Sequence, residues 1–403
     1  MNKTSPTIDF LIIGAGIIGI TVALELRRRH PQASISVVDK EATPGCHASG
    51  RNSGVLHAGF YYPADSLKAR FTRDGNRMMR RYCRERGLSI NPCGKLVVAT
   101  NDKDLAGMDL LRERARANDV ILETITPGEA RERVPELRDP RAVLFSPTTA
   151  TVNPGEILAS LVKDAREQHI DVRFHKPYRG RQGNGIRLGN DRVEPGYVIN
   201  AAGLHADAIA RDFGFSQTMA IVPFKGLYLK YALKNHAIPM NIYPVPDLNN
   251  PFLGVHYTLT ADGTLKIGPT AIPALWREHY HGFSGFKAGD MLDILRRQGA
   301  MFWHDPFHFR TLAFQELAKM RRGALLRLAS RLATPPGPAA AWHWGPAGIR
   351  AQLLRTTDHT LVMDFHFEGD QHSFHILNAV SPGFTCAFPF AQFLCEQMAV
   401  LTK

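Results

Sequence analysis

The chain has 403 residues, of which 44% are hydrophobic and 21% charged, a balance typical of a globular protein and too long for one ordinary core. Its net charge of +12 favours anionic partners, but there is no basic segment interleaved with aromatic residues, so we expect no nucleic-acid partner. The five cysteines form no CxxC pair and are odd in number, which indicates a reducing compartment, without a disulfide scaffold or a bound metal.

The N-terminal segment has the features of a βαβ dinucleotide-binding unit. Residues 8–13 are an apolar, β-branched run that predicts a strand, and residues 17–26 predict a helix. The GxGxxG pattern at 14–19 lies between them and allows a tight turn, close approach of the backbone to a pyrophosphate, and close helix-to-strand packing. Asp39 ends the next strand, where a carboxylate can accept hydrogen bonds from a ribose diol. A glycine-rich turn in an unrelated α/β protein is the alternative.

The rest of the chain predicts alternating helices and strands at both ends of a β-rich middle. Residues 43–63 are rich in Gly, Ser and His, which is typical of a functional loop. The predicted elements that follow are a helix at 64–86, a strand at 95–100, helices at 102–117, 127–133 and 154–168, strands at 172–175 and 197–200, β runs at 221–231, 252–260 and 264–268, mainly helix at 286–332, a strand at 373–380 and a last helix to about 400.

This order predicts an α/β nucleotide-binding domain that is interrupted by a second domain. The first domain is assigned residues 1–85, 150–218 and 340–403, and the second is assigned residues 86–149 and 219–339. We expect no signal peptide and no membrane-spanning segment near the N-terminus, because the apolar run there is short and carries the motif glycines.

The basic stretch 317–332 has two interpretations, an ordinary surface helix or a helix in peripheral contact with a membrane. On a helical wheel one side collects Leu317, Met320, Ala324, Leu325, Leu328 and Leu332. Arg321 and Arg331 intrude on that side, so the amphipathicity is imperfect. We therefore expect a cytoplasmic protein, with peripheral contact to the inner membrane as the alternative.

Five motifs together resemble one group of flavoproteins. They are Gly14-Ala-Gly-Ile-Ile-Gly19, the 47–62 segment with Asn-Ser-Gly-Val-x-His-x-Gly-x-Tyr-Tyr, Asn200-Ala-Ala-Gly203, Gly348-Ile-Arg-Ala-Gln352 and Asn378-Ala-x-Ser-Pro-Gly383. They are similar to the D-amino-acid-oxidase-type superfamily of FAD-dependent oxidoreductases, and most similar within it to the L-2-hydroxyglutarate dehydrogenase/oxidase family. The resemblance implies FAD as cofactor and a Rossmann-type, glutathione-reductase-like FAD-binding domain interrupted by a β-rich α+β substrate domain.

The resemblance also assigns residues to FAD. The ADP half is expected at the glycine motif and Asp39, the flavin along the 47–55 segment, and the flavin pyrimidine carbonyl at the N-terminus of the last helix, which can stabilise negative charge. The full set is Gly14, Gly16, Ile17, Ile18, Gly19, Asp39, Lys40, His47, Ser49, Gly50, Asn52, Ser53, Val55, Ala202, Gly203, Gly348, Arg350, Ser381, Gly383, Phe384 and Thr385.

Oxidation of a hydroxyl next to a carboxylate needs a base for the O–H proton and cations for the carboxylate groups. His57 is the first candidate for the base, because histidine titrates near neutral pH and this one lies in the most specific motif. His256, on a predicted strand that resembles the family's histidine-bearing strand, is the second. For either residue, the alternative is a buried histidine bonded to a carbonyl.

Arg350 is the candidate anchor for the substrate carboxylate, with Tyr62, Arg51 and Lys225 as helpers. A structural arginine that bridges two domains is the alternative for Arg350. The family usually has histidine at position 51, and it shows Pro-Phe-Arg-Gly-Glu-Tyr where this chain has Pro-Phe-Lys-Gly-Leu-Tyr at 223–228. Both departures affect the expected substrate more than the fold or the cofactor.

The resemblance implies oxidation of a small anionic 2-hydroxy acid, most similar to L-2-hydroxyglutarate, to the 2-oxo acid, with electrons passed to a quinone or to oxygen. An amino-acid or amine oxidase of the same fold is the alternative, since a neutral amine needs no strong base. A flavin-binding protein without turnover is a third hypothesis.

Overall fold

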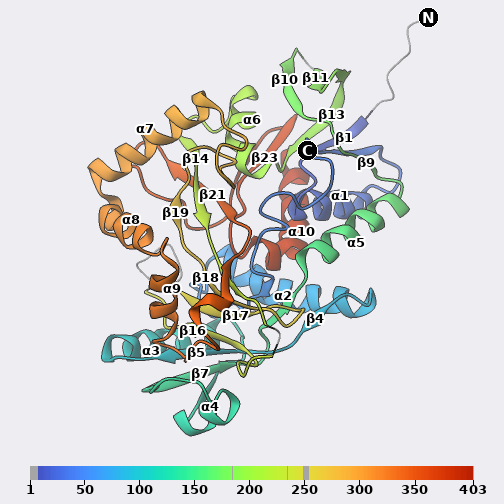
Figure 1. The fold of residues 1–403 in the computed structure, drawn as a ribbon. Helices are drawn as coiled ribbons and strands as arrows, with labels where there is room; N and C mark the ends of the chain where they lie inside the picture. Colours follow the sequence, from blue (N-terminus) through green and yellow to red (C-terminus); the bar gives the residue numbers. More distant parts are fainter. Residues whose placement is uncertain (1–7, 184, 234, 248–253, 403) are drawn as a thin grey trace, which may run out of the picture. The chain divides into compact units, whose positions relative to one another are not determined.

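The computed structural model describes residues 8–183, 185–233, 235–247 and 254–402. The chain divides into two compact units (Figure 1). Unit 1 comprises Met1–Asn52, Pro154–Val222 and Ala351–Lys403, and unit 2 comprises Ser53–Asn153 and Pro223–Arg350.

Unit 1 is built on a six-stranded sheet in the order β22-β23-β13-β1-β2-β9, in which only the edge strand β22 is antiparallel to its neighbour. The strands are β1 (Ile8–Ile13), β2 (Ile35–Val38), β9 (Asp171–Arg173), β13 (Pro195–Asn200), β22 (His366–Gly369) and β23 (Ser373–Asn378). A small sheet adds β10 (Tyr178–Gln182), β11 (Gly185–Leu188) and β12 (Asp191–Val193). The helices are α1 (Ile17–Arg29), α5 (Pro154–Glu167), α6 (Ala206–Asp212) and α10 (Gly383–Leu401), with the short helix η1 (Gly203–His205). The parallel sheet is the predicted Rossmann-type arrangement.

Unit 2 is β-rich and contains an eight-stranded mixed sheet in the order β20-β15-β18-β17-β16-β5-β7-β6. Its strands are β5 (Lys95–Ala99), β6 (Glu123–Ile125), β7 (Ala142–Ser146), β15 (Leu229–Tyr231), β16 (Asn241–Pro244), β17 (His256–Leu259), β18 (Leu265–Gly268) and β20 (Trp342–Trp344). A second sheet contains β3 (Val55–Leu56), β8 (Ala150–Val152) and β4 (Ile90–Asn91), and β14 (Met219–Gly226) pairs with β19 (Ile272–Pro273). The strand β21 (Gly348–Arg355), like β14, continues across a unit boundary. Residues 252–253 of one predicted run lie outside the described residues.

The helices of unit 2 follow their sequence signals closely. They are α2 (Leu67–Glu85), α3 (Asp102–Ala117), α4 (Pro127–Arg133), α7 (Ala288–His304), α8 (Phe309–Ala318) and α9 (Arg322–Ala329), with the short helices η2 (Pro306–His308) and η3 (Ala339–Ala341). The limits predicted for α3 and α4 are confirmed. At α4 the Thr126 hydroxyl accepts from the Glu129 amide at 3.2 Å while the Glu129 carboxylate accepts from the Thr126 amide at 2.7 Å, so this capping box fixes the helix start.

The strand β5 separates two hydrophobic clusters of unit 2. Leu96 and Val98 point into a cluster that includes residues of α4 and α9, whereas Val97 and Ala99 point into a cluster with residues of α3. Because side chains alternate along a strand, Lys95 lies on the same face as Val97 and Ala99. A lysine therefore starts a strand whose two faces are both buried.

The units differ from the predicted domain limits at four places, of which two are short: residues 150–153 belong to unit 2 and residues 219–222 belong to unit 1. Residues 53–85 belong to unit 2, because β3 pairs with β8 and the Asn76 side chain on α2 donates to the carbonyls of Leu56 and Thr148. Residues 340–350 also belong to unit 2, where β20 pairs with β15. These pairings join segments that are far apart in the sequence, so local sequence patterns did not indicate them.

The single amphipathic helix considered for 317–332 is not observed. The helix α8 ends at Ala318 and α9 begins at Arg322, so the wheel face is interrupted. Leu325 and Leu332 are 0% and 3% exposed and pack in the core of unit 2. Among the described residues, only α10 is long and apolar enough to cross a membrane, and this is weak evidence because half of its apolar window is buried and it packs against α1.

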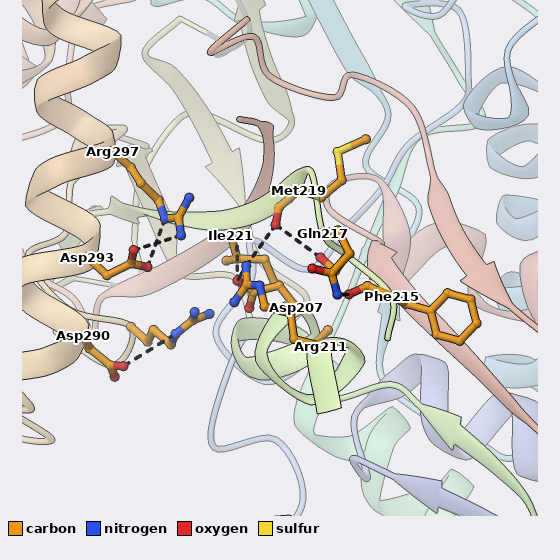
Figure 2. Close-up of polar contacts among 12 residues, drawn as sticks. Asp207, Arg211, Phe215, Gln217, Met219, Ile221, Asp290, Asp293 and Arg297 are labelled. Carbon is orange, nitrogen blue, oxygen red and sulfur yellow. Dashed lines mark hydrogen bonds and ion pairs between the residues drawn. The ribbon is translucent and has the colours of Figure 1, made fainter. Parts of the chain in front are cut away.

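A buried carboxylate ties α6 to the beginning of β14 in unit 1 (Figure 2). Asp207 is 0% exposed and accepts hydrogen bonds from the Ile221 amide and from the Arg211 guanidinium, both at 3.1 Å. Arg211 also donates to the Met219 carbonyl at 2.9 Å. These bonds hold the segment that follows the turn at Ala202 and Gly203. In unit 2, Figure 2 shows a different pair, in which Arg297 contacts Asp293 at 2.8 Å one turn away on α7.

We expect Asp207→Ala to lower the free energy of unfolding by about 2 kcal/mol, because it leaves a buried amide donor and a partly buried guanidinium without their acceptor. The matched control is Asp293→Ala, which removes an i,i+4 pair near the surface and should cost at most about 0.5 kcal/mol. Urea unfolding of both variants measures the difference. Equal losses would contradict the structural role of Asp207.

Candidate active site

The glycines of the β1 to α1 loop are required by close backbone contacts. Gly14 has a φ of +111°, and a Cβ there would lie 2.5 Å from the Ala201 carbonyl oxygen. A Cβ on Gly19 would lie 1.9 Å from the Gly14 carbonyl oxygen, and one on Gly16 would lie 3.1 Å from Ser49 Oγ. The loop thus leaves bare backbone at the N-terminus of α1, as binding of a pyrophosphate requires.

The carboxylate of Asp39 is held at the end of β2 beside this loop. One oxygen accepts from the Ala15 amide at 2.8 Å and the other accepts from the Glu41 amide at 2.9 Å. Each carboxylate oxygen can accept more than one hydrogen bond, so capacity remains for ribose hydroxyls.

The 45–52 segment is folded against the N-terminus of α1. Ser49 Oγ accepts from the Ile17 amide at 2.9 Å, and Asn52 Nδ2 donates to the Ser49 carbonyl at 2.8 Å. Arg51 Nε donates to the Cys46 carbonyl at 2.6 Å, so this arginine braces its own loop within unit 1. Its role as a substrate helper stays a prediction.

His47 belongs to a polar cluster that also contains Lys40 and Glu41. Its Nε2 lies 2.8 Å from Glu41 Oε1 and 3.0 Å from Lys40 Nζ, and Lys40 also contacts Glu41. Burial would raise the pKa of Glu41, but hydrogen bonds from Lys40 and His47 outweigh it and leave that pKa below its usual value. The cluster joins Lys40 and Glu41, which directly follow Asp39, to His47 in the next segment.

Two other predicted cofactor segments lie in unit 1. At the end of β13 the Ala202 amide donates to Asn200 Oδ1 at 3.2 Å, and Gly203 has a φ of +54°. The helix α10 begins at Gly383, whose amide donates to the Val380 carbonyl at 2.9 Å, and a Cβ on Gly383 would meet nothing within 4 Å. The first turn of α10 contains Phe384 and Thr385, and Ser381 lies two residues before the helix. Of the remaining predicted cofactor residues, Ser53, Val55, Gly348 and Arg350 belong to unit 2.

The two candidate bases both lie in unit 2 and are both buried. His57 follows β3 and is 7% exposed, and His256 begins β17 and is 3% exposed. Burial lowers the pKa of His57 to about 3, with further lowering from Lys95, His256 and Arg350. Burial likewise lowers the pKa of His256 to about 3, with further lowering from Lys95. Both imidazoles are therefore neutral near pH 7. The charge of Lys95 lowers the pKa of both rings.

The ring of His256 is held in one tautomer. Its Nδ1 lies 2.7 Å from the Gly254 carbonyl oxygen, so Nδ1 carries the proton and Nε2 has the basic lone pair. The ring stacks on Tyr243, with centroids 3.7 Å apart and an interplanar angle of 20°. The carbonyl-bonded histidine considered from the sequence is thus observed at His256, and this bond also orients Nε2 as an acceptor.

Side chains from α2 and α3 fix the backbone around His57. Asn76 donates to the His57 carbonyl at 3.1 Å. Asn118, directly after α3, donates to the carbonyls of Gly59 and Tyr62 at 3.0 Å each, and Arg114 donates to the Tyr61 carbonyl at 2.6 Å. These contacts could not be predicted from the sequence, because side chains that donate to distant carbonyls form no local pattern.

Arg350 interacts electrostatically with two tyrosines and one carboxylate. Burial lowers its pKa, while Tyr228, Tyr62 and Glu316 act in the opposite direction. Burial raises the pKa of Tyr228 to about 12, so this phenol is protonated at neutral pH. Arg350 therefore interacts electrostatically with Tyr62 and also acts on His57, and the substrate roles of Arg350 and Tyr62 stay predictions. Lys225 lies on β14, where burial lowers its pKa and its charge acts on His279; its helper role stays a prediction.

Lys95 is the residue of this group that sequence reasoning missed. It is 0% exposed, and its Nζ lies 4.7 Å from the ring centroid of Phe60, 4.5 Å from that of Tyr61 and 4.7 Å from that of Tyr243. Burial lowers its pKa to about 7. The available signal was a lysine directly before the apolar run 96–99, on the strand predicted at 95–100.

Comparisons with known proteins show the family and the fold of the chain. The sequence profile of the FAD-dependent oxidoreductase family matches residues 9–397. An L-2-hydroxyglutarate dehydrogenase of Escherichia coli is 34% identical over 98% of this chain and 93% of its own length, and the mitochondrial one of Bos taurus is 32% identical over 98% and 90%. In fold, the chain is similar to an FAD-bound L-alpha-glycerophosphate oxidase from Mycoplasma pneumoniae, with a TM-score of 0.77 and 18% identity over 98% of this chain and 95% of that one.

We expect Gly19→Ala to purify with much less FAD than the wild type, because the added Cβ collides with the Gly14 carbonyl and displaces the loop. Gly289→Ala is the control, since a Cβ at that position in α7 meets nothing within 4 Å. The ratio of flavin to protein absorbance measures occupancy. Full FAD content in Gly19→Ala would show that this loop does not hold the cofactor.

The lowered pKa values of His57 and His256 predict a loss of stability in acid. Between the ordinary pKa of 6.5 and the folded value of about 3, the unfolded chain binds more protons than the folded protein. Stability is therefore complete above pH 6.5 and falls as the pH drops toward 3, by up to about 1.4 kcal/mol per pH unit for each histidine. The double variant His57→Gln/His256→Gln should show a shallower fall in urea unfolding. An unchanged slope would mean that the two imidazoles do not resist protonation.

Proposed function

Because the chain belongs to the family of FAD-dependent oxidoreductases, we propose that it oxidises L-2-hydroxyglutarate to 2-oxoglutarate. The observation that carries the proposal is the pair of buried neutral histidines in unit 2, of which His256 has its Nδ1 bonded to the Gly254 carbonyl, with Lys95 acting electrostatically on both rings and Arg350 acting on His57. A neutral imidazole can accept a hydroxyl proton, and the two cations match an anionic substrate. Relatives that are 32 to 34% identical over nearly the whole chain are named for this activity.

The cofactor of the family is FAD, and the residues of unit 1 suit it. Bare backbone at Gly14, Gly16 and Gly19 leaves room for a pyrophosphate, and Asp39 is oriented to accept from a ribose. When bound, FAD supplies the acceptor for the hydride that leaves the substrate carbon.

The substrate roles follow from charge and protonation state. Arg350 binds the carboxylate next to the reacting carbon, and Tyr62 supports it as a hydrogen-bond donor. His57 accepts the hydroxyl proton, and His256, with its basic Nε2, is the second candidate for that step. The low pKa of both rings reflects burial among cations, so entry of a dianion offsets the positive field and makes the imidazole a stronger base.

The experiment that tests the proposal is anaerobic mixing of the FAD-loaded enzyme with L-2-hydroxyglutarate, its D-isomer, L-glutamate and glycerol 3-phosphate. Loss of oxidised-flavin absorbance with the L-hydroxy acid alone is the expected result. L-Glutamate is the matched comparison, because it replaces the hydroxyl by an amine on the same carbon skeleton. Reduction by L-glutamate alone would instead support an amino-acid oxidase, and reduction by none of the four would contradict the proposal.

We expect His57→Gln to slow flavin reduction by about 10²- to 10⁴-fold while FAD stays bound, because the base is lost and the cofactor residues of unit 1 are unchanged. His256→Gln keeps a donor for the Gly254 carbonyl and tests the second candidate in the same way. Stopped-flow absorbance gives the rate. Unchanged reduction in His57→Gln together with a large loss in His256→Gln would transfer the role of base to His256.

The reduced enzyme must pass its electrons on. We infer a quinone or oxygen as acceptor and the cytoplasm as location, with the inner-membrane surface as the alternative. Reoxidation rates with oxygen and with a soluble quinone distinguish the acceptors.

A further inference from the structure

We propose that Lys95 binds the carboxylate remote from the reacting carbon and so makes the site selective for dicarboxylic over monocarboxylic 2-hydroxy acids. This inference rests on the proposed function and adds a specificity-determining residue to it. Four observations in unit 2 support it, and they concern burial, surroundings, neighbouring charge and packing.

The ammonium of Lys95 is buried without an acceptor. The side chain is 0% exposed, and within residues 8–183, 185–233, 235–247 and 254–402 its Nζ has no hydrogen-bond partner. An ammonium has three donors, and leaving them unsatisfied away from water is costly. A ligand carboxylate is the acceptor that would satisfy an ammonium best.

The surroundings hold a cation in place but do not neutralise it. The rings of Phe60, Tyr61 and Tyr243 all lie within 4.7 Å of Nζ, close enough for cation–π attraction. The Tyr61 hydroxyl is also buried and has no hydrogen-bond partner among the residues that the structure describes. It offers a second donor beside the ammonium, and a carboxylate can accept from both.

Lys95 and Arg350 both act on His57, but each of these cations has different neighbours. Lys95 and Arg350 both lower the pKa of His57. Arg350 interacts with Tyr228 and Tyr62, whereas Lys95 also acts on His256. A substrate with a carboxylate next to its hydroxyl and another at the far end of its chain needs this arrangement of one base and two cations.

Packing gives no reason for a lysine at position 95. The following residues on the same strand face, Val97 and Ala99, are apolar and 0% exposed. Burial lowers the pKa of Lys95 to about 7, and no carboxylate among the described residues contributes in the opposite direction. An apolar side chain of similar length would remove this cost, so the lysine is explained better by a ligand than by the fold.

The test compares two substrates of equal chain length in the full-length, FAD-loaded enzyme. L-2-Hydroxyglutarate has the remote carboxylate, and L-2-hydroxypentanoate lacks it. We expect Lys95→Met to lower kcat/KM for the diacid by about 30-fold or more and to change it by less than about threefold for the monoacid. Lys163→Met, a change at an exposed lysine, is the control and should alter neither value. Equal losses for both substrates, or no loss for either, would overturn the proposal.

A binding measurement keeps the test independent of turnover. By calorimetry, wild-type holoenzyme should bind 2-oxoglutarate more tightly than 2-oxopentanoate, and Lys95→Met should lose this preference. If the wild type is reduced by neither hydroxy acid, the proposed function fails, and the calorimetric preference still decides the role of Lys95; its absence in the wild type would overturn that role.

Folding of the variant is checked by urea unfolding. We expect Lys95→Met to be at least as stable as the wild type, because it removes a buried charge. If Lys95→Met does not fold, Lys95→Gln, which is neutral and polar, replaces it in both measurements, with the same expected loss of the diacid preference and the same overturning results.

Discussion

The cost of burying positive charge is the constraint on which the site in unit 2 depends. Lys95 is 0% exposed, and burial lowers the pKa values of Lys95 and Arg350. The same loss of water, together with the positive field of these cations, keeps His57 and His256 neutral. Buried positive charge costs free energy when the site is empty, and a bound dianion offsets that cost. The same buried charge therefore lowers the stability of the empty protein and favours binding of a dianion.

Side-chain donors hold the backbone around this site in unit 2. Asn76 and Asn118 donate to carbonyls on both sides of the loop that starts at His57, Arg114 donates to the Tyr61 carbonyl, and the Gly254 carbonyl sets the tautomer of His256. These bonds to backbone carbonyls orient the loop and the ring without adding a carboxylate that would cancel positive charge. In unit 1, by contrast, the glycine loop and Asp39 expose amide and carboxylate groups that suit a dinucleotide.

Sequence patterns predicted the parts that depend on local spacing. The strand predicted at 8–13, the loop and helix that follow it, and the helix predicted at 127–133 are set by neighbouring residues and are confirmed, and the structure adds the capping box at Thr126. The continuity of the 317–332 helix was wrong, because helical periodicity alone does not show that α8 ends at Ala318 and that α9 begins at Arg322. Lys95 was missed for a similar reason, since its significance arises only when rings from the 60–61 loop and from β16 surround it.

The roles of Arg350 and Lys95 are tested best by a crystal structure of the FAD-loaded enzyme with the product 2-oxoglutarate bound. We expect one carboxylate within hydrogen-bond distance of Arg350, the other within hydrogen-bond distance of Lys95 Nζ, and the keto oxygen beside His57 or His256. A complex in which the product lies away from these residues, or in which Lys95 touches no carboxylate, would contradict these roles.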